Sequence, residues 1–150
     1  MREKAIIVDI DGTIANNSHR VRFVDGSQVK DWDQFNALSA NDPVNEWCRD
    51  MVYGLHDQGY KIVFLTARNG SKETREMTER WLKANIRQDI PYVLYMREVG
   101  DTRTDFISKE EIYLVQIAPY YDVVMAIDDK RFVCDMWLSL GIVALHCSDY

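Results

Sequence analysis

The stretch AIIVDIDGT, residues 5–13, decides the fold of this chain. Apolar residues lead into Asp9 and Asp11, and Gly12 and Thr13 follow directly. A short, nearly continuous apolar run predicts a strand that is buried on both faces of a parallel sheet, and the glycine predicts a turn after it. We therefore expect a first strand over residues 5–10 that delivers two carboxylates to one turn.

Four further apolar runs predict strands over residues 61–65, 92–96, 123–127 and 142–146. Segments with helical spacing alternate with them, at residues 43–58, 71–87, 105–118 and 130–140. This alternation predicts an α/β fold, a three-layer α/β/α Rossmann-like sandwich with a central five-stranded parallel sheet and right-handed crossovers. The polar segment at about residues 14–40 predicts a small flap or cap inserted after the first strand, with a short helix near residues 31–38.

The composition bounds the class of protein. The 150 residues, 47% of them hydrophobic and 28% charged, fit one globular domain over residues 1–150. The net charge of −6 argues against broad coating of nucleic acid. No apolar run near the start is long enough for a signal peptide or a membrane span, so we expect a cytoplasmic protein with no membrane partner.

The cysteines and tryptophans predict core residues. Cys48, Cys134 and Cys147 follow no metal-binding pattern, so we expect reduced thiols, the first two buried and inert. Three tryptophans recur at apolar positions of the predicted helices, and we expect them in the core: Trp47, Trp81 and Trp137.

Chemically useful side chains follow the predicted strands. Thr66 and Arg68 follow the second strand, Arg97 the third, and Asp128 and Asp129 the fourth. Because ligands of open α/β sheets bind beyond the carboxyl ends of the strands, we expect these groups to meet there. Two acidic pairs at one edge demand a cation, and Mg²⁺ suits carboxylates combined with water and phosphate.

Four motifs in this order, residues 9–13, Thr66, Lys109 and residues 128–129, resemble the haloacid dehalogenase superfamily of aspartate-nucleophile phosphatases. The resemblance implies that Asp9 is the nucleophile and forms an aspartyl-phosphate. It implies that Asp11 is the general acid for the leaving alkoxide and then the base for water. Thr66 and Lys109 would hold the phosphoryl oxygens.

The same resemblance implies a Mg²⁺ site. Asp9 and Asp128 would bind the ion directly, and Asp11 would contribute its backbone carbonyl. Asp129 would bind the ion through water or orient Lys109.

The second half resembles one family more closely. Residues 96–105, 109–112, 117–119 and 126–129 look like the 3′-phosphatase domain of phage polynucleotide kinase-phosphatase, and the likeness covers about residues 6–141. The GxxxxGK[ST] loop of its kinase half does not occur in these 150 residues. The chain departs from the phage enzyme at Lys130, which replaces an arginine, and in the flap.

This likeness implies a set of substrate-binding residues: Gly12, Thr13, Arg20, Arg68, Arg97 and Asp105. The arginines would lie near the phosphate, since their planar forks suit it. Asp105, four residues before Lys109, would hold that lysine by an ion pair. Trp32 and Phe23 of the flap give a further hypothesis, stacking on a base.

Taken with these residues, the resemblance implies a Mg²⁺-dependent phosphomonoesterase that removes 3′-phosphates from polynucleotide ends or nucleotides, as in nucleic-acid end repair. A nucleotidase or another small-metabolite phosphatase of the same superfamily is the alternative. A non-enzymatic phospho-receiver module is a remote third, because a receiver lacks an acid/base residue at the position of Asp11 and carries its phosphorylated aspartate after the third strand. The expected partner is a phosphorylated nucleic-acid end or nucleotide.

Overall fold

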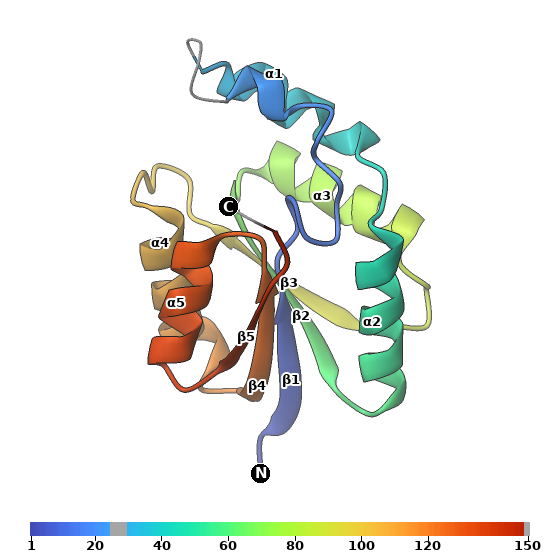
Figure 1. Cartoon of the computed structure of the whole chain (residues 1–150), viewed down its shortest axis with the longest axis vertical. Helices are drawn as coiled ribbons and strands as arrows, with labels where there is room; N and C mark the ends of the chain where they lie inside the picture. Colours follow the sequence, from blue (N-terminus) through green and yellow to red (C-terminus); the bar gives the residue numbers. More distant parts are fainter. Residues whose placement is uncertain (25–29, 149–150) are drawn as a thin grey trace.

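The computed structural model describes residues 1–24 and 30–148. The sheet has the order β3-β2-β1-β4-β5 with all neighbouring pairs parallel (Figure 1). Its strands are β1 (Glu3–Val8), β2 (Lys61–Asn69), β3 (Tyr92–Arg97), β4 (Tyr121–Asp128) and β5 (Val143–His146). The predicted five-stranded parallel sheet is confirmed. Its order places the carboxyl end of β1 between those of β2 and β4.

Helices cover both faces of the sheet (Figure 1). Helices α2 (Glu46–Asp57) and α3 (Lys72–Asn85) pack with Ile6 and Val8 of β1. Helices α4 (Asp105–Ile112) and α5 (Arg131–Ser139) pack with Ala5 and Ile7. This alternation along β1 is what a strand buried on both faces requires, because successive side chains point to opposite faces. The three-layer sandwich is confirmed.

The insert after β1 lies over the carboxyl end of the sheet (Figure 1). It contains the short helices η1 (Val21–Phe23), α1 (Trp32–Ala37) and η2 (Leu38–Asn41). The Asp31 side chain caps α1 by accepting a hydrogen bond of 3.0 Å from the Gln34 backbone N–H. The predicted flap is therefore present, although its residues 25–29 lie outside the described part of the chain.

The start of α2 differs from the prediction. The helix begins at Glu46, with Asn45 as its N-cap, and not at Pro43. Pro43 accepts a hydrogen bond of 2.8 Å from the backbone N–H of Asn16, and Val44 bridges to Ala15. These pairings hold the segment before Glu46 in an extended conformation.

Two further boundaries also differ. Strand β2 continues to Asn69 beyond a shift in its register with β3, so Thr66 lies within this strand and not after it. Helix α4 ends at Ile112 and is followed by a π-helical turn, η3 (Tyr113–Ile117). The predicted helix over residues 105–118 thus changes its winding a little past its midpoint, after Ile112.

The core residues agree with the sequence except at one tryptophan. Trp81, Trp137, Cys48 and Cys134 are buried, and the cysteines are free thiols. Trp47 is 46% exposed, so its predicted core position is wrong.

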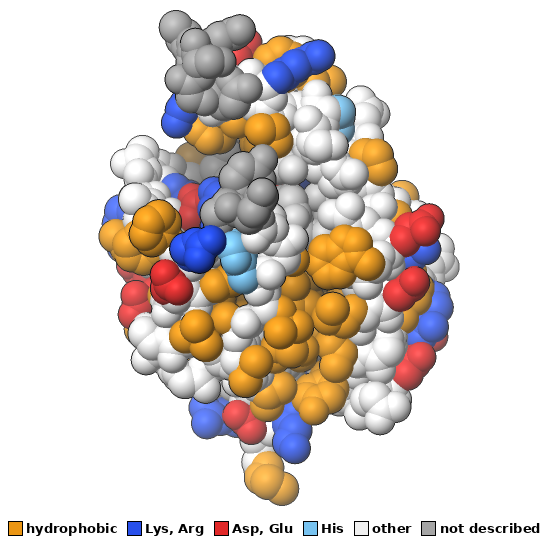
Figure 2. Space-filling view, viewed as in Figure 1, with side chains coloured by type: hydrophobic (Ala, Val, Ile, Leu, Met, Phe, Trp, Pro, Cys, Tyr) orange, Lys and Arg blue, Asp and Glu red, His pale blue; other side chains and the backbone are white. Residues whose placement is uncertain are grey.

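Hydrophobic side chains gather on the face of the molecule over the edge strand β5 and towards α2 (Figure 2). Val143 and Leu145 of β5 are also exposed on the surface. Among the helices of the described residues, none has the length and apolar character needed to cross a membrane.

Candidate active site

Three carboxylates meet at the carboxyl end of the sheet. Asp9 directly follows β1, Asp128 ends β4 and Asp129 comes next. All three residues are buried, and one oxygen atom from each lies within 4.8 Å of the others. The predicted convergence of the first and fourth strands on one site is therefore present in the structure.

This carboxylate cluster, Asp9, Asp128 and Asp129, carries more negative charge than its surroundings balance. Burial, together with repulsion from Asp128, raises the pKa of Asp9 to about 6. Burial and the charges of Asp9 and Asp128 raise the pKa of Asp129 to about 9. Close, desolvated carboxylates of this kind fit a divalent cation with oxygen ligands, such as Mg²⁺.

Lys109 supplies the cation of this cluster. Its Nζ donates hydrogen bonds to Asp9 Oδ1 at 2.9 Å and to Asp128 Oδ2 at 2.6 Å. Burial alone would lower the pKa of Lys109, but Asp128 and Asp9 outweigh burial and hold it above its usual range. The ammonium is therefore permanently charged and fixed beside Asp9.

The expected ion pair between Asp105 and Lys109 does not form. Asp105 accepts a hydrogen bond of 2.7 Å from Arg97 Nη2, and its other oxygen pairs with Lys130. Lys109 is turned inward to Asp9 instead, because the buried carboxylates attract it more strongly than a partly exposed one.

Arg97 stabilises the loop between β3 and α4 by hydrogen bonds. Its Nη1 donates to the backbone carbonyls of Asp101 at 3.3 Å and Arg103 at 2.8 Å, within the connection between β3 and α4. All of these contacts are made to the protein itself. The predicted phosphate contact of Arg97 stays a prediction.

Asp11 does not join the carboxylate cluster through its side chain. Arg68 binds it with two hydrogen bonds, from Nε at 2.9 Å and from Nη2 at 2.7 Å, and Arg20 donates a third. Burial would raise the pKa of Asp11, but Arg68 and Arg20 outweigh it and hold this pKa below its usual range. In this arrangement Asp11 is ionised, the form of a general base.

Asp42 was missed by the sequence analysis, and it anchors Arg20. Its buried carboxylate accepts bonds from Arg20 Nε at 2.8 Å, Arg20 Nη2 at 2.7 Å and His19 Nε2 at 2.7 Å. Arg20 is fully buried, and its guanidinium lies 4.3 Å from the centre of the Phe35 ring. Asp42 precedes a proline, which signals a turn or a cap, so nothing in the sequence pointed to an anchor for Arg20.

The turn after β1 fits closely against the cluster. Gly12 has a φ of +76°, and a Cβ there would lie 2.3 Å from Asp129 Oδ2, so both its conformation and its surroundings require glycine. Thr13 Oγ1 donates to Asp9 Oδ2 at 3.0 Å. Thr66 is buried, and its Oγ1 accepts a bond of 3.2 Å from the Arg68 backbone N–H.

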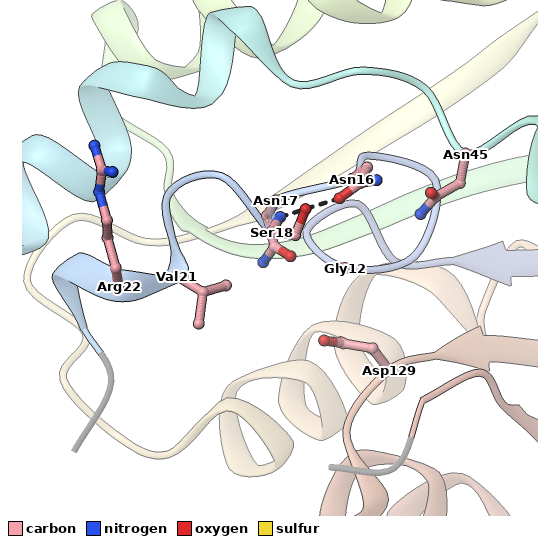
Figure 3. Close-up of a pocket in the computed structure, with 8 residues that line it drawn as sticks. All are labelled: Gly12, Asn16, Asn17, Ser18, Val21, Arg22, Asn45 and Asp129. Carbon is pink, nitrogen blue, oxygen red and sulfur yellow. Dashed lines mark hydrogen bonds between the residues drawn. The ribbon is translucent and has the colours of Figure 1, made fainter. Parts of the chain in front are cut away.

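A cavity of about 460 Å³ adjoins the cluster at Gly12 and Asp129 (Figure 3). Neither Trp32 nor Phe23, the proposed base-stacking residues, is among its lining residues. Trp32 is half exposed and packs edge-on against Phe35 with 5.5 Å between ring centres. Base stacking by these residues stays a prediction.

Comparison with known proteins gives a consistent result. Residues 3–149 match the family described as "Polynucleotide kinase PNKP phosphatase domain". The chain is 28% identical over 151 residues to a "Putative bifunctional polynucleotide kinase/RNA ligase" of Autographa californica nuclear polyhedrosis virus. That alignment covers 98% of this chain and 20% of the viral protein.

Solved structures agree with this match. "Structure of Pnkp1/Rnl/Hen1 complex" contains a chain with 30% identity and a TM-score of 0.79, and the match covers 98% of this chain and 46% of that one. "Structure of the Pnkp1/Rnl/Hen1 RNA repair complex" gives 29% identity, a TM-score of 0.80, and 99% and 44% coverage.

A more distant structure shares the fold alone. The class C acid phosphatase from Bacillus anthracis has 14% identity and a TM-score of 0.62, with 99% of this chain and 70% of that one covered. The fold, the ordered motifs at the strand ends and the family match agree with one another. This chain is a phosphatase of the haloacid dehalogenase superfamily and belongs to the polynucleotide kinase PNKP phosphatase domain family.

Proposed function

We propose that this chain is a Mg²⁺-dependent phosphomonoesterase that removes 3′-phosphates from nucleic-acid ends or nucleotides through an aspartyl-phosphate at Asp9. The observation that carries the proposal is the setting of Asp9. Its two carboxylate oxygens accept hydrogen bonds from Lys109 and Thr13, and it lies beside Asp128 and Asp129. A carboxylate oriented in this way, next to a cation site, is suited to attack phosphorus.

The proposed reaction has two displacements. One oxygen of Asp9 forms a bond to phosphorus while the bond from phosphorus to the ester oxygen breaks, and Asp11 gives a proton to the departing oxygen. A water molecule then attacks phosphorus and gives its proton to Asp11, while the bond between phosphorus and Asp9 breaks. Inorganic phosphate leaves, and both aspartates return to their starting state. Lys109 and Thr66 would hold the phosphoryl oxygens.

Asp11 must carry a proton before the first displacement, whereas its two arginines hold it ionised. The dianionic phosphate of a substrate competes for the same guanidinium forks, which bind phosphate well. We infer that Arg68 exchanges part of its contact with Asp11 for the substrate phosphate, so that the pKa of Asp11 rises on binding. Arg68 thereby binds the phosphate and also sets the pKa of Asp11, the general acid.

The cluster of Asp9, Asp128 and Asp129 fits Mg²⁺ by its donor set of buried carboxylate oxygens. Mg²⁺ bound there supplies the positive charge that offsets repulsion between Asp9 and the phosphate. The backbone carbonyl of Asp11 is the remaining proposed ligand.

The family supports a nucleic-acid substrate. The chain spans about a fifth of the viral kinase/ligase and under half of the chains in the Pnkp1/Rnl/Hen1 complexes. The kinase, ligase and complex named for those proteins are theirs. For this chain we propose the phosphatase step alone, carried by residues 1–150 as one domain in the cytoplasm.

The second candidate is a nucleotidase or another small-metabolite phosphatase. The cavity beside the cluster, at about 460 Å³, lies in the size range of small-molecule sites, so it favours a compact leaving group. A phospho-receiver remains remote because Asp11 stands next to the nucleophile and favours turnover.

A phosphate-release panel tests the proposal. It compares 3′-phosphorylated DNA, 3′-phosphorylated RNA, nucleoside 3′-monophosphates and sugar phosphates, each over a range of salt and oligonucleotide length. We expect 3′-phosphorylated ends to be best, with short oligonucleotides nearly as good as long ones. The salt dependence should be shallow, since few phosphates are contacted. Preference for a sugar phosphate would overturn the 3′-end assignment and favour the second candidate.

A further inference from the structure

The cavity beside the carboxylate cluster lies between the loop after β1 and the end of β4 (Figure 3). Residues from three parts of the chain line it: Gly12, Asn16, Asn17, Ser18, Val21, Arg22, Asn45 and Asp129. Because Gly12 and Asp129 also border the cluster, any group in this cavity lies directly next to the phosphate centre. The cavity is therefore a space beside the cluster that the leaving group of a phosphate ester can occupy.

The walls of this cavity are rich in carboxamides with unused hydrogen-bonding capacity. Asn17 makes no side-chain hydrogen bond with any residue that the structure describes. Asn16 Oδ1 accepts a bond of 3.0 Å from the Ser18 backbone N–H, and its Nδ2 donates to no described residue. In Figure 3, Asn17 and Asp129 point into the same space, whereas Arg22 points away from it. The cavity thus offers neutral donors and acceptors.

We propose that this cavity takes the sugar of the leaving nucleoside and that Asn16 and Asn17 bind the hydroxyl vicinal to the phosphoester, so that the enzyme prefers 3′-phosphorylated ribonucleotide ends over deoxyribonucleotide ends. This inference rests on the proposed 3′-phosphatase function. The 2′-hydroxyl of a ribose is on the carbon next to the phosphoester. It is therefore the polar group of the leaving nucleoside that lies nearest to the phosphate centre.

The chemistry of the lining favours this hydroxyl over other groups. A hydroxyl both donates and accepts, and a carboxamide offers both functions at one side chain. A second phosphate is disfavoured because Asp129 faces the cavity and the Arg22 guanidinium lies over the Phe23 ring at 4.8 Å. A base would find no aromatic side chain among the lining residues that the structure describes. A deoxyribose end leaves the carboxamides without that partner, so it binds without the hydrogen bonds that a ribose end makes, and its affinity is lower.

Two oligonucleotides that differ only in the terminal sugar test the inference. Both carry a 3′-phosphate, one on a ribose and one on a 2′-deoxyribose, so the rest of the strand is constant. We expect kcat/KM to favour the ribose end by roughly tenfold, the effect of one or two hydrogen bonds. The 2′-hydroxyl is also the group by which proteins tell RNA from DNA.

Variants assign the preference to the cavity. Asn17→Ala and Asn16→Ala should each lower kcat/KM for the ribose end and leave kcat/KM for the deoxyribose end within about twofold of wild type. The ratio of kcat/KM for the ribose end to that for the deoxyribose end therefore moves toward one. Asn36→Ala, at an exposed asparagine of α1, is the matched control and should keep the ratio. Asn17→Ser replaces Asn17→Ala if thermal melting shows that the alanine variant does not fold.

Hydrolysis of p-nitrophenyl phosphate separates the possible failures. It needs no sugar and reports the phosphatase chemistry alone, so it should be equal in all folded variants. A wild-type ratio near one, or a ratio that survives both asparagine variants, overturns the sugar pocket while the 3′-phosphatase function stands. Turnover of p-nitrophenyl phosphate with neither oligonucleotide hydrolysed overturns both proposals.

Discussion

Lys109 Nζ donates a hydrogen bond of 2.9 Å to Asp9 Oδ1, although 100 positions separate these residues in the chain. The same ammonium also donates to Asp128, so one buried cation is shared by two of the three clustered carboxylates. The cluster keeps an excess of negative charge, and burial together with repulsion between its carboxylates raises the pKa values of Asp9 and Asp129. Reactivity and stability both depend on how that charge is balanced.

Replacing Asp9, the proposed nucleophile, should abolish turnover. Asp9→Asn keeps the shape of the side chain, but an amide does not form the acyl phosphate, so we expect a loss of about a thousandfold or more in kcat. Phosphate release measures the loss, and the melting temperature checks the fold. Residual turnover above a few per cent in a clean preparation contradicts the assignment of Asp9.

Metal dependence should follow the carboxylate cluster. EDTA should abolish activity, Mg²⁺ should restore it, and Ca²⁺ should support it poorly because it prefers more ligands and a looser geometry. Asp128→Asn should raise the Mg²⁺ concentration needed for half-maximal rate, while Asp122→Asn, at an exposed site on β4, should not. Full activity in excess EDTA is incompatible with the proposed site.

The stability of the metal-free protein should decrease with rising pH. The pKa values of Asp9 and Asp129 are raised from 3.8 to about 6 and about 9. A carboxyl group with a raised folded pKa binds its proton more tightly in the folded state, so stability is lost as pH rises from the unfolded value through the folded value.

We therefore expect the melting temperature in EDTA to fall between about pH 4 and pH 9, as followed by calorimetry, and Mg²⁺ to reduce the fall. Asp129→Asn should remove the part of the fall at the alkaline end. A melting temperature that rises over this range in EDTA would contradict the raised pKa values of Asp9 and Asp129.

Gly12 and Gly141 form a matched pair of glycines. Both have a positive φ, +76° and +78°, but only at Gly12 would a Cβ meet a neighbour, Asp129 Oδ2 at 2.3 Å. Gly141→Ala should cost about 1 kcal/mol from backbone strain alone and leave activity intact. Gly12→Ala should cost more and should also weaken Mg²⁺ activation, because Asp129 must move. Equal effects of the two changes on stability and activity would contradict the close fit at Gly12.

Asp42 should prove essential for holding the buried guanidinium of Arg20 in place. Asp42→Asn leaves the guanidinium of Arg20 buried with Asp11 as its one remaining carboxylate partner among the described residues, so we expect a loss of about 3 kcal/mol or more in the free energy of unfolding. Activity should fall as well, because Arg20 would no longer be held against Asp11. Asp33→Asn, at an exposed site on α1, should change stability by no more than about 0.5 kcal/mol. Chemical denaturation that shows Asp42→Asn to be as stable as wild type falsifies this role.

The fold was predictable because its signals are local. The apolar runs of β1 and β4 and the cap at Ser71, whose hydroxyl accepts from the Thr74 N–H, are properties of short segments. The start of α2 could not be predicted in this way. Pro43 signals a helix start, but the pairing of Ala15 with Val44 holds that segment extended. A contact between distant segments overrode the local preference.

The site was predictable in its residue types but not in its pairing. The carboxylates of Asp9 and Asp128 follow strands, and parallel strands end at one edge, so their convergence follows from topology. The ion-pair partners of Asp105 could not be predicted in this way. The helical spacing favours Lys109 as its partner, but Arg97 and Lys130, which come from other elements, bind Asp105 instead.

The sequence by itself determined which chemistry this protein carries, because the motif of residues 9–13, Lys109 and the aspartate pair at residues 128–129 can be recognised from residue type and order alone. Only the tertiary structure decided the state of each group. Asp42 fixes Arg20, and Arg20 with Arg68 keeps Asp11 ionised. Charge interactions depend on distance and burial, and the chain creates both when it folds.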